Sequence, residues 1–71
     1  MVDLIALNAR VSASGIKRQA IAQEMGISAP TLRRKLRGNT PITANDIDAL
    51  GRVLNLTRQD VTKIFFARQV N

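Results

Sequence analysis

Apolar side chains recur at helical spacing along most of the chain. Leu4, Leu7 and Val11 stand at the i, i+3 and i+7 positions of an amphipathic helix expected over residues 3–14. No segment has the strand pattern of alternating apolar and polar residues. The pattern predicts an all-α fold, a compact bundle of about five short helices. They are expected over 3–14, 17–25 and 28–37, with two more beginning near Thr43 and Thr57.

Residues that cap helices mark the boundaries between these segments. Gly26 is expected in the left-handed conformation that ends the second helix, since glycine takes a positive φ without steric cost. Ser28 is expected to cap the third helix, with Pro30 in its first turn, where a missing N–H costs nothing. Gly38 is expected to end that helix, and Asn55 to end the fourth in a left-handed conformation.

The last two helices carry a further start signal. Thr43 and Asp46, and again Thr57 and Asp60, have the three-residue spacing of a capping box. Gly51 lies inside the fourth helix, where glycine costs about 1 kcal/mol relative to alanine. We interpret it as marking a close contact with a neighbouring helix.

The third helix is expected to separate apolar from basic side chains. Leu32 and Leu36 are four residues apart and are predicted to face the core. Lys35 is expected at one flank of the helix. The opposite arc, about 100° wide, holds Pro30, Arg33, Arg34 and Arg37.

Charge narrows the range of partners. The net charge of +6, from eleven basic and five acidic residues, suggests a polyanion but does not separate nucleic acid from an anionic membrane. Segment 17–38 contains six of the eleven basic residues and a single acid, Glu24. A solvated, arginine-rich surface is the plainer alternative, and the arrangement as two helices joined by a turn favours nucleic acid.

Several chemistries lack their usual residues. Without cysteine or histidine there is no disulfide framework, no thiolate metal site and no usual general base. Asp46 and Asp48 are two apart on a helix and point in different directions, which argues against a metal site. No enzymatic activity and no cofactor are expected. No apolar run approaches the ~20 residues that span a bilayer, and a cytoplasmic location is expected.

The segment 17–38 resembles the helix-turn-helix of the phage repressor and Cro-like (XRE-type) DNA-binding family. The resemblance covers about residues 4–66 and implies the lambda repressor-like fold and a bacterial or phage-infected host cell. The length of 71 residues predicts one domain over residues 1–71. The matching positions are Ala22, Gly26, Ile27, Ser28, Thr31, Leu32, Leu36 and Gly38.

The resemblance also implies how DNA would be bound, with the helix at about 28–37 in the major groove. Positions that contact bases in the family are Ala29, Pro30, Arg33 and Arg34 here. Positions that hold phosphates are Lys17, Arg18, Thr31, Arg37 and Asn39.

Two departures from the family's pattern concentrate base reading on arginines. Many relatives have glutamine at the position of Arg18, and polar side chains at those of Ala29 and Pro30. Ala29 and Pro30 have no side-chain hydrogen bonds to offer, so direct readout falls to Arg33 and Arg34. A generic phosphate contact remains the alternative role for each arginine, and DNA shape is a further source of specificity.

A single motif of this size usually binds too weakly to act alone, so a homodimer on two half-sites is expected. Phe66 and Val70 are candidates for the dimer contact, with burial of both phenylalanines in the core as the alternative. The competing function is that of an antirepressor, which would use the same helix-turn-helix surface to bind a partner repressor protein.

Overall fold

The computed structural model describes residues 1–67, and this part of the chain contains five helices and no strand. The predicted all-α fold is confirmed. Val70 lies outside the described residues. The helices are α1 (Leu4–Ala13), α2 (Arg18–Met25), α3 (Ala29–Leu36), α4 (Ala44–Val53) and α5 (Arg58–Phe65).

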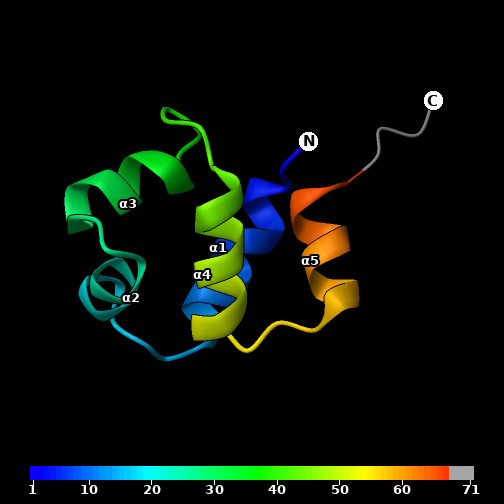
Figure 1. Ribbon diagram of the computed structural model, residues 1–71, viewed down its shortest axis with the longest axis horizontal. Coiled ribbons are helices and arrows are strands. Elements are labelled where there is room, and N and C mark those ends of the chain that lie inside the picture. The colour runs from blue at the N-terminus through cyan, green and yellow to red at the C-terminus, as the bar shows by residue number, and fades with distance from the viewer. Residues whose placement is uncertain (68–71) are drawn as a thin grey trace.

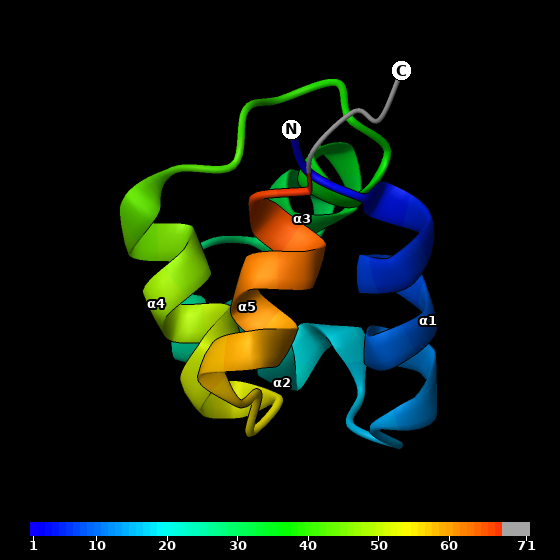
Figure 2. The same ribbon diagram turned by 90° about the vertical axis from the view of Figure 1, so that its right-hand side faces the viewer.

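The helices pack around one apolar core. α2 packs against both α3 and α4, α1 lies against α3 and α5, and α4 also contacts α5. Figure 1 shows α2 and α3 together at one end of the molecule and α5 at the other, and Figure 2 shows α1, α4 and α5 around the opposite end. The largest fully buried side chains are Leu7, Val11, Ile21, Leu32 and Leu50.

The capping residues act as predicted. The Ser28 hydroxyl accepts a hydrogen bond from the Thr31 backbone N–H at 3.2 Å, and α3 begins at Ala29. Both expected capping boxes, at Thr43 and at Thr57, are present. Gly26 and Asn55 are left-handed, with φ of 73° and 54°. These local signals therefore fix the limits of four of the five helices.

The interpretation of Gly51 is wrong. A Cβ built on Gly51 would lie 3.8 Å from Cγ2 of Val61, which is an ordinary van der Waals contact. The backbone there is helical, so neither a close approach nor a positive φ requires glycine.

We expect Gly51→Ala to raise the free energy of unfolding by up to about 1 kcal/mol, because alanine restricts the unfolded chain and favours the helix. Gly26→Ala is the matched comparison and should lower it by about 1 kcal/mol or more, because Gly26 is left-handed. Urea unfolding followed by circular dichroism measures both. A destabilised Gly51→Ala would show that α4 and α5 approach more closely than these contacts indicate.

Candidate nucleic-acid interface

The turn between α2 and α3 is fixed by backbone hydrogen bonds and by a small side chain. The Ile27 N–H donates to the Ala22 carbonyl at 3.0 Å, and the Gly26 N–H donates to the Gln23 carbonyl at 3.1 Å. These paired bonds are the Schellman arrangement that ends a helix at a left-handed glycine. Ala22 is buried, and Ile27 packs against the core from the turn. α3 is thereby held at a fixed orientation to α2.

α3 has one apolar and one basic face, as predicted. Leu32 and Leu36 are buried in the core. Ala29, the first residue of the helix, is half-buried. The opposite face is exposed and carries Pro30, Arg33, Arg34 and, just after the helix, Arg37.

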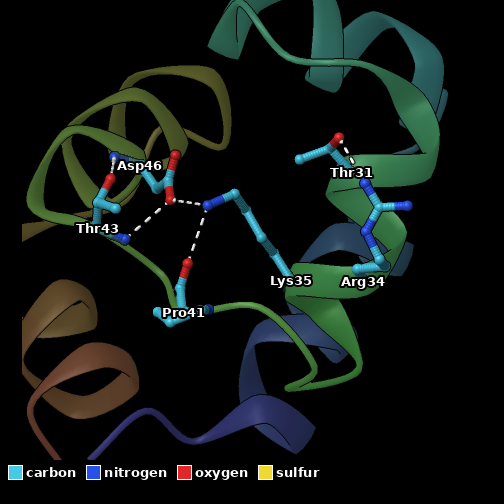
Figure 3. A network of polar contacts seen from close by, with 6 residues as sticks. All are labelled: Thr31, Arg34, Lys35, Pro41, Thr43 and Asp46. Carbon is cyan, nitrogen blue, oxygen red and sulfur yellow. Dashed lines mark hydrogen bonds and ion pairs between the residues drawn. The ribbon is translucent and has the colours of Figure 1, made fainter.

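Lys35 lies apart from the exposed arginines of α3 and is buried on the core side of the helix. Its side chain is buried, with 8% of the residue exposed, and its ammonium group lies 2.7 Å from Oδ2 of Asp46. It also donates to the Pro41 carbonyl at 2.9 Å, as Figure 3 shows. Helical periodicity alone missed this because the partner belongs to α4. Lys35 is therefore a structural cation that cannot reach a phosphate.

Asp46 completes this network from the first turn of α4. Burial works against ionisation of its carboxyl, but hydrogen bonds from Lys35 and Thr43 outweigh burial and hold the pKa of Asp46 below its ordinary value. The Thr43 backbone N–H donates to the same oxygen at 2.8 Å. One carboxylate thus caps α4, anchors the loop before it and neutralises a lysine of α3.

Three ion pairs neutralise acidic side chains of α4 and α5. Besides Lys35 and Asp46, Arg52 pairs with Asp48 at 2.6 Å within α4. Arg10 of α1 lies 3.3 Å from Asp60 of α5. Among the described residues, the lysines and arginines outside ion pairs are Lys17, Arg18, Arg33, Arg34, Arg37, Arg58 and Lys63. Five of these seven belong to segment 17–38, which gives the α2–α3 end its positive charge.

The predicted phosphate-binding residues occupy the ends of α2 and α3. Lys17 and Arg18 are exposed where α2 begins, and a terminal nitrogen of Arg18 lies 3.4 Å from the Ser12 hydroxyl. Asn39 is exposed just beyond α3, and its backbone N–H closes that helix by donating to the Arg34 carbonyl at 2.9 Å. Thr31 is half-buried near the start of α3. These residues lie at helix ends that precede and follow Arg33 and Arg34 along the chain.

Two sets of polar residues beside α3 were missed. The Asn8 side chain of α1 donates to the Leu36 carbonyl at 3.0 Å, which satisfies a carbonyl at the C-terminal end of α3. Its spacing of four from Leu4 places it on the core side of its helix, a signal that the sequence contains. Gln19 and Gln23 of α2 line an open hollow with Ala29 and Pro30. They place carboxamides beside the two candidate positions that have none.

These features define a helix-turn-helix protein: two short helices joined by a tight turn, with the second exposing basic side chains. The family model for a helix-turn-helix domain matches residues 6–63, and the chain belongs to this family, which is related to the XRE-type domains. Neither the curated proteins nor the solved structures include a match. A helix-turn-helix domain of this kind is that of a DNA-binding regulator. The family is typically non-enzymatic.

Residues 1–67 contain no group of three or more metal-binding side chains. No helix within them is long and apolar enough to cross a membrane.

We expect Asp46→Asn to lower the free energy of unfolding by about 3 kcal/mol, because it leaves the buried Lys35 charge without a counterion. Asp48→Asn is the matched control on the same helix: its side chain is 75% exposed, so we expect a change within about 0.5 kcal/mol. Urea unfolding at neutral pH compares the two. Equal effects would mean that Lys35 finds solvent when Asp46 is neutral.

Proposed function

We propose that this protein is a sequence-specific transcriptional regulator of the Cro or repressor type that places α3 in the major groove of DNA. The observation that carries the proposal is the exposed face of α3. Arg33, Arg34 and Arg37 lie there with no acidic partner among the described residues, while Leu32 and Leu36 bind the helix to the core. This face is free to meet a polyanion and is rigidly supported.

The candidate residues make two kinds of contact, with bases and with phosphates. Base edges are read from the pair Arg33 and Arg34, because the two-donor fork of an arginine matches the O6 and N7 acceptors of guanine. A phosphate contact is the alternative role of each of the two. Ala29 and Pro30 can contact only thymine methyl groups. The phosphate contacts, which set position and non-specific affinity, come from Lys17, Arg18, Thr31, Arg37 and Asn39.

Two copies bind one site. Half-sites about one helical turn apart require a two-fold symmetric protein. Phe66 supports this, because 59% of this residue is exposed whereas its neighbour Phe65 is buried. Phe66 also lines an open groove between α4 and α5 whose other apolar residues include Ile47, Leu56 and Val61. Val70 is a second proposed contact.

Selection of bound duplexes from a random DNA pool tests the function. We expect the wild-type chain to enrich a two-fold symmetric site and the Arg33→Ala/Arg34→Ala variant to lose that enrichment. The matched control is Arg58→Ala/Lys63→Ala, which removes the same charge from α5. Since α5 packs against α1 and α4, at the opposite end from α3, this control should keep the site.

Loss of the enriched site in both double variants would mean that binding depends on the net charge of the protein and not on the arginines of α3. A wild-type chain that enriches no duplex would contradict the proposed function. In that case the same α3 surface would be tested for binding to a partner repressor protein, the antirepressor function.

We expect Phe66→Asp to abolish self-association and leave the fold intact, because it puts a charge on an exposed apolar contact. Analytical ultracentrifugation gives the oligomeric state, and circular dichroism checks the helices. Ile5→Asp is the control, since Ile5 is 86% exposed on α1. It should not affect a dimer that forms through α4 and α5. An unchanged dimer in Phe66→Asp would remove Phe66 from the interface.

A further inference from the structure

The two central arginines of α3 differ in their surroundings. A terminal nitrogen of Arg34 donates a hydrogen bond to the Thr31 hydroxyl at 3.0 Å, and Figure 3 shows its side chain turned back along the helix toward Thr31. Arg33 is exposed and makes no side-chain hydrogen bond or ion pair to the described residues. Adjacent residues of the same type therefore have different freedom, one held and one free.

The Thr31 hydroxyl is itself held in place. It lies 2.8 Å from the Ser28 hydroxyl, and the Ser28 oxygen also accepts the Thr31 backbone N–H at 3.2 Å. Thr31 is half-buried and β-branched, so its side chain has few alternative rotamers. Ser28, Thr31 and Arg34 thus form a chain of hydrogen bonds, three residues apart at each step, that begins at the helix cap.

These hydrogen bonds leave Arg34 able to recognise a base. A guanidinium group has five N–H donors, two on each of two edges and one more. Thr31 occupies one donor, so at least one complete two-donor edge remains for the O6 and N7 of guanine. Holding a flexible side chain in advance reduces the conformational entropy lost on binding. An unrestrained arginine loses that entropy at each site it contacts.

We propose that Arg34 is the specificity-determining arginine of α3, that Thr31 is the residue that positions it, and that Arg33 contacts phosphate without reading sequence. The inference rests on the proposed DNA-binding function and assigns different roles to two residues that the sequence treats alike. Thr31 also gains a second role. Its oxygen accepts from Arg34, and its single proton serves either Ser28 or a phosphate.

The test repeats the selection from a random duplex pool with four single variants. Arg34→Lys and Thr31→Val should both reduce the preference for guanine at one and the same position of each half-site, by about fivefold or more. Valine matches the shape of threonine and lacks the hydroxyl, while the Thr31 backbone N–H still reaches Ser28. Thr31→Ser, which restores a hydroxyl, should recover the preference.

Arg33→Lys is the matched control for Arg34→Lys, since each keeps its charge and loses the two-donor fork. It should leave the enriched site unchanged. Melting curves by circular dichroism confirm that every variant is folded. A shared loss of preference at one position would not follow from a merely structural role for Thr31, which would weaken all duplexes alike.

Three results would overturn the inference. If Thr31→Val keeps the wild-type site while Arg34→Lys changes it, Thr31 does not position Arg34 in the complex. If Arg33→Lys loses guanine and Arg34→Lys does not, the two roles are reversed. A wild-type chain that enriches no site would contradict the proposed function as well, and that outcome is separated from the other two by the wild-type selection alone.

Discussion

The ion pair between Lys35 and Asp46 is the polar contact that joins α3 to α4, in addition to the turn that sets the orientation of α3 to α2. It joins the exposed basic helix to the first turn of α4, and through the Pro41 carbonyl it also fixes the intervening loop. A chain of this length buries only about 60% of the surface that its unfolded chain exposes. Its apolar core is therefore small, and polar contacts contribute to how the short helices are oriented. An apolar pair could match the stability of this ion pair. It would not specify both the loop and the cap of α4.

The ion pairs of the described residues also determine which acidic side chains remain without a basic partner. Each of the three ion pairs neutralises one acid on α4 or α5, and none involves an exposed basic residue of α3. The remaining acids are Asp3, which caps α1, and Glu24. Glu24 lines a different hollow of α2 from the one that borders Ala29 and Pro30. The positive potential of the α2–α3 end therefore results from where acids are placed as much as from the arginines themselves.

The sequence predicts most of the fold because its signals are local. Ser28, Thr43 and Thr57 satisfy backbone donors within three residues, and Gly26 needs only its own positive φ. The partners of Lys35 and Asn8 could not be predicted in the same way, since they lie on another helix. Helical periodicity gives the direction of a side chain but not what meets it there. The exposed arginines of this face were located correctly because, among the described residues, none of them forms an ion pair or a side-chain hydrogen bond to another helix.

The basic side chains of α3, with Arg37 just after it, have three different environments. Lys35 is buried and stabilises the fold, Arg34 is exposed but held by Thr31, and Arg33 and Arg37 are exposed without a side-chain partner in the described chain. A charge count treats these side chains as equal. In the proposed complex with DNA, the freedom of each side chain sets its role: the buried cation orients the helix, the held arginine discriminates between bases, and the free arginines contact phosphates.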